Sequence, residues 1–438
     1  MLVFGDTAGT GFGTVTRDLC LALIREGADP RLMSINEDAG FQVDPGWPVA
    51  LKDRTVMLGL PDGWMSQALQ EVGPVAVKEA VKALGVFAGK TIPGWRPQAC
   101  LFISDHGSLE RSTWLQVMPK DIPAFIYEPI EGVGLAPSWA ELWKRVKPIA
   151  MTNAAADEVA KVNGGERPPV VYHGVDPNTF WKVSPERPLM LRTGPTSTLA
   201  LKTKNDCRRL LGWDPAWIVM FRADRLMPRK QFPAMFRALA PVIAKHPESR
   251  LILHCRTRDQ GGDMHHEVSK YPQPIRDRIV STGMHDRYGG APREILMAMY
   301  NAADILISTS AEGFGLTVAE ALACGTPAVA LKFSALPEVV GPAGILVDDW
   351  ALIDNIYSYF WAMPKGDGYT EAVERLVSDR EERERLGRLG PSHVAQFSWD
   401  TAAKQMLAIM QGQDPAIIAT EAPTERRLAA LGLVGGRA

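Results

Sequence analysis

Short apolar runs alternate with longer segments of helical spacing along most of the chain. The first example is LVFGD at residues 2–6, which opens with an apolar run, followed by a glycine-rich segment and then by Val15, Leu19 and Leu23 at four-residue intervals. An uninterrupted short run predicts a buried strand, and the four-residue spacing predicts an amphipathic helix. Repetition of this strand-then-helix unit predicts an α/β fold built on parallel sheets.

The pattern forms two series separated by an irregular, proline-rich stretch at 176–200. The first series predicts strands at 2–6, 31–36, 99–105, 124–129 and near 148, with helices at 14–27, about 65–87 and up to 162. The second predicts strands at 217–224, 249–255, 278–284, 305–309 and 343–349, with helices at 232–246, 293–303, near 350–362 and around 369–388. Residues 41–63 are expected to be loop with short strands, and the tail after 413 holds one short helix at 425–433.

Two series of this kind predict two Rossmann-like domains facing each other across a cleft. We expect the N-terminal domain to span 1–180 and to be completed by a C-terminal helix within 395–438, while 181–394 form the second domain. In open parallel sheets, ligands bind beyond the carboxyl ends of the strands, so motifs placed there are candidates for function.

Composition narrows the class of protein. The chain of 438 residues is 46% hydrophobic and has a formal net charge of -2, which suits two filled cores and does not suit a general polyanion binder. Its five cysteines are scattered and lack a CxxC pair, which argues for a reducing compartment and against a disulfide framework or a structural zinc site. Because no leader pattern or long apolar run is present, we expect a cytoplasmic protein without a membrane span.

The segment from Ile305 to Val329 is the most informative. It predicts a buried strand, a glycine turn and a helix ending at Gly325, with Glu312 in the turn and Glu320 on the helix. Backbone N–H groups at such a helix start favour an anion. The two acids have three interpretations: surface acids, a glycosidase pair, or ligands for a nucleotide sugar. The glycine turn favours the third, because a hydrolase needs no phosphate-binding turn.

Two further segments bear on phosphate binding. Four cations run from the end of a predicted strand into a helix start, which favours a bound anion over a solvated basic turn: Arg222, Arg225, Arg229 and Lys230. The Gly9–Gly13 loop departs from GxGxxG because Thr14 stands where the third glycine belongs, so a nicotinamide site is only weakly supported. That loop is either a bare turn or a place where backbone approaches a phosphate or a sugar.

The motifs EGFGLTVAEALACGTPAV, DRLMPRK and VYHGVD followed by Phe180 resemble those of the retaining family-4 glycosyltransferases, which have the GT-B fold. The resemblance implies that Glu312 lies near the donor sugar and that Glu320 binds the ribose. It also implies that Arg225 and Lys230 hold the diphosphate. Residues expected to line the donor or to approach it by their backbone are Gly11, Gly13, Met284, His285, Gly313, Phe314, Gly315, Leu316 and Thr317.

The resemblance has one departure. Many family members carry a histidine after the strand that corresponds to 124–129, whereas this chain continues with an acid at Glu128 and another at Glu131. Glu131 is the first choice for the site and Glu128 the second, with His106 at the preceding strand end as a further catalytic candidate. The pair His265–His266 is interpreted as a solvated loop rather than a metal site, since a third ligand at suitable spacing is missing.

The resemblance therefore implies a retaining, metal-independent transferase that uses a UDP- or GDP-type nucleotide sugar and requires no cofactor. The acceptor stays open: a glycan, a lipid, a protein or a modified nucleobase. Two other functions also stay open, namely a nucleotide-sugar epimerase or phosphorylase-like enzyme of the same fold, and a sugar-nucleotide binding module without activity. Trp139 and Trp143 are interpreted as core packing rather than a membrane-surface helix.

Overall fold

The computed structural model describes residues 1–34, 46–52, 54–57, 86–87, 90–91, 97–111, 122–285, 290–355 and 357–415. The helix predicted at 425–433 lies outside these residues, as does about half of the loop predicted at 41–63. The helix predicted at about 65–87 also lies outside them except for its last two residues, Val86–Phe87, which form a strand rather than a helix. Two compact units are present. The first contains Met1–Ile130, Gly134–Gly174 and residues 398–415, and the second contains Glu131–Val133 and Val175–Phe397.

The first unit is built on a parallel sheet of six strands in the order β3-β2-β1-β6-β7-β8. The strands are β1 (Leu2–Gly5), β2 (Arg31–Ser34), β3 (Thr55–Met57), β6 (Cys100–Ile103), β7 (Ala124–Glu128) and β8 (Lys147–Ala150). Its helices are α1 (Gly11–Arg25), α2 (Val49–Lys52), α5 (His106–Arg111), α7 (Trp139–Trp143), α8 (Asn153–Val162) and α19 (Trp399–Met410). The short strands β4 (Val86–Phe87) and β5 (Lys90–Thr91) pair separately. This is the Rossmann order, whose direction reverses between β1 and β6.

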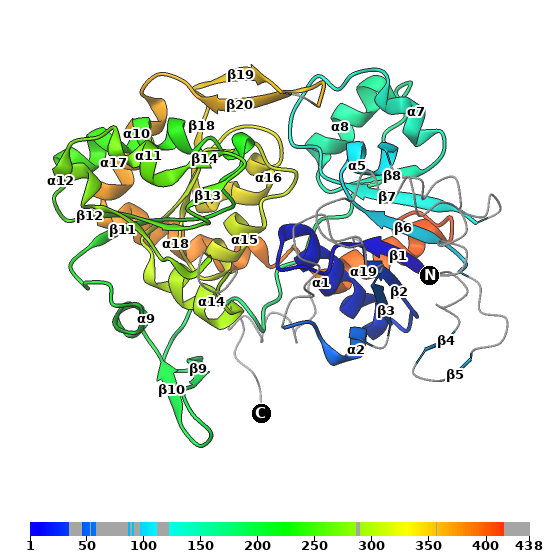
Figure 1. Cartoon of the computed structure of the whole chain (residues 1–438), viewed down its shortest axis with the longest axis horizontal. Helices are drawn as coiled ribbons and strands as arrows, with labels where there is room; N and C mark the ends of the chain where they lie inside the picture. The colour runs from blue at the N-terminus through cyan, green and yellow to red at the C-terminus, as the bar shows by residue number, and fades with distance from the viewer. Residues whose placement is uncertain are drawn as a thin grey trace. The chain divides into compact units, whose positions relative to one another are not determined.

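Helix α1 shows how the local sequence sets an element. The Thr10 hydroxyl accepts a hydrogen bond from the Gly13 backbone N–H, so the helix begins at Gly11, inside the glycine loop and earlier than predicted. Gly13 is required by packing, because a Cβ there would lie 1.9 Å from the Ala8 carbonyl oxygen. Helix α19, drawn in orange-red in Figure 1, packs against α1, so the C-terminal segment returns to the first unit.

The second unit repeats the same topology, with the strand order β15-β12-β11-β16-β17-β18. The strands are β11 (Ile218–Ala223), β12 (Ser249–His254), β15 (Ile279–Ser281), β16 (Ile305–Ser308), β17 (Ala328–Leu331) and β18 (Gly344–Val347). Its helices are α9 (Lys204–Leu211), α10 (Phe232–Lys245), α11 (Met264–Ser269), α12 (Gln273–Arg276), α14 (Arg293–Ala302), α15 (Leu316–Ala323), α16 (Leu336–Val340), α17 (Gly368–Ser378) and α18 (Arg380–Val394), with 3-10 turns η1 (Pro228–Lys230) and η2 (Gly341–Ala343). Strands β16 and β17 are buried along their whole length and form the centre of the core.

Three predicted elements were wrong. The helix expected near 350–362 is an antiparallel pair, β19 (Trp350–Asp354) with β20 (Phe360–Pro364). Phe360 is exposed between the buried Tyr359 and Trp361, and side chains that point to opposite faces in succession are typical of a strand. The stretch at 176–200 is not wholly irregular. It contains the hairpin of β9 (Leu189–Arg192) and β10 (Thr198–Leu201), which projects beside α9 in Figure 1.

The third wrong prediction is the single charged helix around 369–388. The structure has two helices there, α17 and α18. Asp379 separates them, and its side chain accepts a hydrogen bond from the Glu382 N–H to cap the second. The predicted domain limits were 180 and 394, and the compact units change over after Gly174 and after Phe397. All five cysteines are buried free thiols. Among the described residues, we find no helix with the length and apolar character needed to span a bilayer.

Candidate functional site

Strands β11 and β16 bring the two main sequence motifs together. They are parallel neighbours in the sheet of the second unit, with Phe221 opposite Leu306. Carboxyl ends of parallel neighbours meet at one edge, so the basic segment after β11 and the glycine turn after β16 lie side by side. Because the strand order reverses between β11 and β16, this edge is also the switch point at which open α/β sheets bind ligands.

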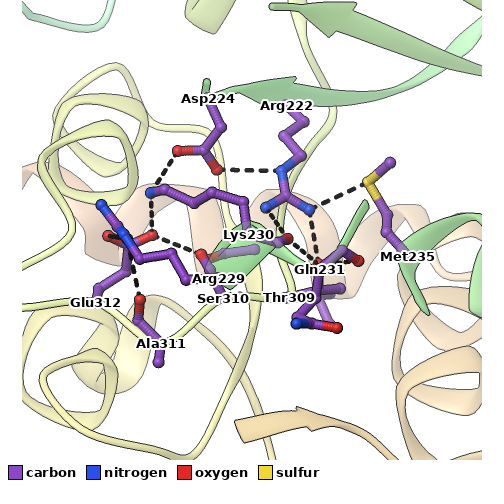
Figure 2. A network of polar contacts seen from close by, with 12 residues as sticks. Arg222, Asp224, Arg229, Lys230, Gln231, Met235, Thr309, Ser310, Ala311 and Glu312 are labelled. Atoms are coloured by element: carbon purple, nitrogen blue, oxygen red, sulfur yellow. Dashed lines mark hydrogen bonds and ion pairs between the residues drawn. The ribbon is translucent and has the colours of Figure 1, made fainter. Parts of the chain in front are cut away.

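Glu312 is the centre of a network of charges at this edge (Figure 2). Its Oε1 accepts from the Lys230 ammonium at 2.5 Å and from the Ser310 hydroxyl at 2.5 Å, and its Oε2 accepts from Arg229 Nη1 at 3.2 Å. Burial alone would raise the pKa of Glu312, but the ammonium and the guanidinium outweigh it and hold the pKa at about 2. Glu312 is therefore an ionised hydrogen-bond acceptor at neutral pH and has no proton to donate.

Lys230 is held between two carboxylates, and Arg222 braces one of them. The Lys230 ammonium contacts Asp224 Oδ1 at 2.6 Å as well as Glu312, and Asp224 Oδ2 accepts from Arg222 Nε at 3.1 Å. Arg222 is almost fully buried; it donates to the Thr309 hydroxyl and lies over the ring of Phe232. Arg222 is thus a structural support for the network rather than an open anion site, and Figure 2 shows its contacts with Asp224 and Met235.

Arg229 joins Glu312 to Glu131. Its Nη2 lies 3.0 Å from Glu131 Oε1, while Nη1 contacts Glu312 and donates to the Ala311 carbonyl at 3.2 Å. Burial would lower the pKa of Arg229, but the charges of Glu131 and Glu312 raise it above its usual value. The structure therefore brings Glu131, rather than Glu128, into the charged network.

A backbone bridge positions Glu131 within the second unit. Val133 and Phe360 exchange backbone hydrogen bonds of 3.1 and 2.8 Å, which fastens the short loop to β20. Gly132 lets the two chains approach, since a Cβ at that position would lie 2.1 Å from the Phe360 carbonyl oxygen. The loop that carries Glu131 depends on the strand pair that the sequence analysis took for a helix.

Arg225 stands apart from this network. Its Nε and Nη2 contact the two carboxylate oxygens of Asp259 at 3.1 and 3.2 Å. Asp259 belongs to β13 (Arg258–Asp259), which pairs with β14 (Gly262–Asp263) in a two-stranded hairpin. Sequence reasoning missed Asp259 and Asp224. Asp224 stands among the predicted cations and was available as a signal, whereas nothing in the local pattern marks Asp259.

The turn that follows Glu312 leads directly into α15. Gly315 is the residue before the helix and has φ of +101°, a left-handed conformation that favours glycine. The Phe314 side chain is buried against Phe397, so only its backbone is available to a ligand, while Gly313, Leu316 and Thr317 lie at the helix start. The N-terminal end of α15 therefore adds the partial positive charge of the helix to this edge of the sheet.

Glu320 lies on the buried side of α15. Its Oε2 accepts from the Tyr300 hydroxyl at 2.9 Å, and its side chain is largely covered. Burial and the Glu320 carboxylate both raise the pKa of Tyr300, which stays a neutral donor. Tyr300 thus fixes the orientation of Glu320, and the sequence offered no signal for this partner.

Met284 and His285 follow β15, at the same end of the sheet. The His285 ring centroid lies 4.4 Å from that of His254, and His254 Nδ1 lies 2.9 Å from the Thr282 hydroxyl. Burial and the neighbouring His285 lower the pKa of His254 to about 3, so His254 is neutral in the physiological range. The histidine pair forms a partly covered aromatic surface beside β12.

His106 and Glu128 meet in the first unit, at the ends of β6 and β7. His106 Nδ1 lies 3.1 Å from Glu128 Oε2, and Trp143 Nε1 donates to Glu128 Oε1 at 2.6 Å. The Trp139 ring stacks on His106 with centroids 3.9 Å apart, and both tryptophans are buried, which confirms their interpretation as core packing. Glu128 is thus an interior residue with its own partners.

The remaining candidates lie outside the charged network. Gly11 lies in the first turn of α1 with open space around it, and Gly13 is packed against Ala8. His265 and His266 are exposed in the first turn of α11 rather than in a loop. Across the described part of the chain, we find no cluster of three or more histidine, cysteine or carboxylate side chains arranged to hold a metal ion.

The chain resembles known proteins both in sequence and in structure. Residues 218–359, which contain the charged network except Glu131, match the family described as glycosyl transferases group 1. Among curated proteins, the chain is 29% identical over 244 residues to the D-inositol 3-phosphate glycosyltransferase of Segniliparus rotundus, covering 54% of this chain and 48% of the relative. The corresponding protein of Corynebacterium efficiens is 32% identical over 264 residues, covering 58% and 56%. The matches span about half the length of these relatives.

Solved structures extend the likeness to almost the whole chain. Sucrose-phosphate synthase from Thermosynechococcus elongatus has a TM-score of 0.65 at 19% identity, covering 94% of this chain and 98% of that one. Anabaena HepE in complex with UDP and glucose has a TM-score of 0.62 at 18% identity, covering 94% and 99%. The fold is therefore GT-B, with two Rossmann-like units, and the match to group 1 glycosyl transferases covers residues 218–359 of the second unit.

Proposed function

We propose that the chain is a retaining glycosyltransferase that moves a sugar from a nucleotide-diphosphate sugar to an acceptor hydroxyl. The observation that carries the proposal is the network of Glu312, Lys230 and Arg229 at the start of α15, inside the segment that matches group 1 glycosyl transferases. Cations and a helix start suit a diphosphate, and an ionised carboxylate suits sugar hydroxyls.

The protonation state of Glu312 favours transfer over glycoside hydrolysis. A glycosidase needs one carboxylic acid that is protonated near neutral pH to protonate the leaving oxygen. Glu312, with a pKa of about 2, is ionised there. Its charge suits it instead to orient the sugar and to stabilise positive charge that develops at the anomeric carbon.

The leaving diphosphate supplies the remaining chemistry in this proposal. The bond from the anomeric carbon to the phosphate oxygen breaks, and the acceptor oxygen bonds to the same face of the sugar. The acceptor's proton passes to the departing phosphate oxygen, so the mechanism needs neither a separate general base nor a metal. Lys230 and the helix start would neutralise the charge growing on that oxygen, and preorganised donors of this kind are commonly worth about 3–4 kcal/mol each.

The donor and the acceptor are part of the proposal. We expect a UDP- or GDP-sugar, and HepE is a structural neighbour solved with UDP and glucose. Since the curated relatives are named for D-inositol 3-phosphate, this phosphorylated polyol is the first acceptor to test, followed by glycans, lipids, proteins and modified nucleobases. The buried free thiols suit a reducing compartment, so we place the activity in the cytoplasm.

A thermal-shift screen of the full chain against UDP-, GDP-, ADP- and TDP-sugars tests the donor. A ligand present at a hundred times its Kd stabilises the folded state by about 2.7 kcal/mol, which gives a clear rise in melting temperature. Transfer is then measured with the stabilising donor and the acceptor panel, with and without EDTA, and the anomeric configuration of the product is read by NMR.

The outcomes separate the competing functions. Conversion of the donor without any acceptor would indicate an epimerase, and donor binding without transfer or hydrolysis would indicate a binding module. Failure of every nucleotide sugar to raise the melting temperature would contradict the proposed function altogether.

A further inference from the structure

The contact between Asp259 and Arg225 has a geometry that can fix the orientation of the arginine side chain. Both carboxylate oxygens of Asp259 contact one edge of the guanidinium, through Nε at 3.1 Å and Nη2 at 3.2 Å. A guanidinium has five N–H donors in a rigid planar fork, so a carboxylate on the Nε edge determines where the rest of the fork points. The Arg225 side chain is 32% exposed and Asp259 only 7%, which places the carboxylate on the inner side and the arginine toward solvent.

The hairpin that carries Asp259 is itself held firmly. The Gly261 N–H donates to the Leu226 carbonyl at 2.7 Å, which ties the hairpin turn to the segment just after Arg225. Space there is minimal, since a Cβ at Gly261 would lie 2.7 Å from the Leu226 carbonyl oxygen. The Gln260 N–H donates to Asp259 Oδ1 at 2.9 Å, so the carboxylate is oriented by its own turn.

The two arms of the expected diphosphate clamp are thus held by different carboxylates. Lys230 is compensated by Asp224 and Glu312 within the buried network, while Arg225 is compensated by Asp259 from the hairpin after β12. Strands β11 and β12 are parallel neighbours, so the hairpin and the basic segment emerge at the same edge of the sheet. This arrangement explains how an arginine outside the buried network keeps a defined direction.

We propose that Asp259 is a positioning residue for donor binding, which holds Arg225 by one edge so that its fork meets the donor diphosphate. This inference rests on the proposed function. Asp259 would then be a further carboxylate that supports the cations expected to bind the diphosphate, and it comes from a hairpin that no sequence motif marks. Asp259 acts only through Arg225 and does not touch the donor itself.

The same contact could instead compete with the donor for Arg225, and an experiment can distinguish the two roles. If Asp259 merely occupied this edge of Arg225 in place of a phosphate, its removal would expose that edge and strengthen donor binding. If Asp259 orients Arg225, its removal weakens donor binding, because the guanidinium loses the contact that holds its Nε edge in one direction. The sign of the change in donor affinity therefore decides between aiming and competition.

The test compares Asp259→Asn with Asp263→Asn, the matched control. Asp263 lies on the partner strand of the same hairpin, and its carboxylate pairs with the exposed Arg258, so the control makes the same chemical change away from Arg225. We expect Asp259→Asn to raise the donor KM and Kd about tenfold, the loss typical of one charge-assisted contact, with kcat changed about twofold or less. Asp263→Asn should leave donor affinity unchanged.

A double-mutant cycle with Arg225→Ala makes the test specific. Since Asp259 acts through Arg225, Asp259→Asn should have no further effect on donor Kd once Arg225 is alanine. Additive losses, an unchanged Kd in Asp259→Asn, or tighter donor binding would each overturn the inference. The melting temperature of each variant shows whether it is folded. Asp259→Glu keeps the negative charge and should recover part of the donor affinity that Asp259→Asn loses. If the unmodified protein binds no nucleotide sugar, the proposed function fails instead.

Discussion

The two sheets of this protein share one topology and differ in what stands at their carboxyl ends. In each sheet all strands are parallel, and the chain starts in the middle and adds strands first on one side and then on the other. The change of side comes between β1 and β6 in the first sheet and between β11 and β16 in the second. At that end of the first sheet, Glu128 is enclosed by His106 and Trp143 in an aromatic interior. At that end of the second, Glu312 joins Lys230 and the partly exposed Arg229.

The difference shows how a carboxylate acquires a role from its surroundings. Glu128 accepts a hydrogen bond from the indole of Trp143 and contacts the imidazole of His106, which stacks on Trp139. Its role is therefore to satisfy buried polar groups. Glu312 faces two cations at the start of a helix, an environment that keeps it charged and suits an anionic ligand nearby. One fold repeated twice therefore carries two kinds of site, and function has to be argued from the residues.

The largest expected effect comes from breaking the charged network. Lys230→Ala or Glu312→Ala should each lower kcat of sugar transfer at least about a hundredfold, because each removes a preorganised charge from the reacting centre. Lys245→Ala is the control, since Lys245 is an exposed lysine of the same unit that pairs with Glu374. Initial rates and circular dichroism spectra would be measured together, and near-normal transfer by both variants would contradict the site.

The second prediction concerns the enclosed carboxylate of the first sheet. Glu128→Ala should lower the free energy of unfolding by about 2 kcal/mol, because the Trp143 and His106 donors lose their buried acceptor. Donor Kd should change little. Glu141→Ala is the control, because Glu141 is an exposed acid on α7 that pairs with Lys144, and it should leave stability almost unchanged.

Chemical denaturation and donor titration would be measured for both variants. A large loss of donor affinity in Glu128→Ala, with stability intact, would remove the contrast between the two sheets.

The smallest effect is a dependence of stability on pH. The pKa of Glu312 is depressed to about 2 in the folded state, below its ordinary value near 4.5, so its ionised form stabilises the fold at neutral pH. This contribution is present above pH 4.5 and is lost as the pH falls toward 2. The stability advantage of the unmodified protein over Glu312→Gln should therefore shrink across that interval. Melting temperatures at successive pH values test this, and a constant difference would mean that Glu312 is not paired as described.

Much of the fold was predictable, because the parallel strands are short apolar runs followed by amphipathic helices. The strand at 305–309 and the helix ending before Gly325 both formed as expected. The strand pair β19–β20 was missed, since the burial of Trp361 and the exposure of Phe360 are set by packing in the second unit and not by local propensity. Glu131 is positioned by that pair, because Val133 bridges to Phe360 of β20. Its contact with the charged network therefore could not be predicted from local sequence.

The sequence by itself determined the α/β layering and the positions of the glycine turn, the basic segment and the acids Glu312 and Glu320. These follow from hydrophobic period and from residues that act within a few positions of one another. Only the tertiary structure decided which charges meet. Arg229 rather than Arg225 contacts Glu312, Asp259 contacts Arg225 from 34 residues away, and Tyr300 contacts Glu320. Such pairs depend on which strands become neighbours in the sheet, and that choice is made by the packing of the whole unit.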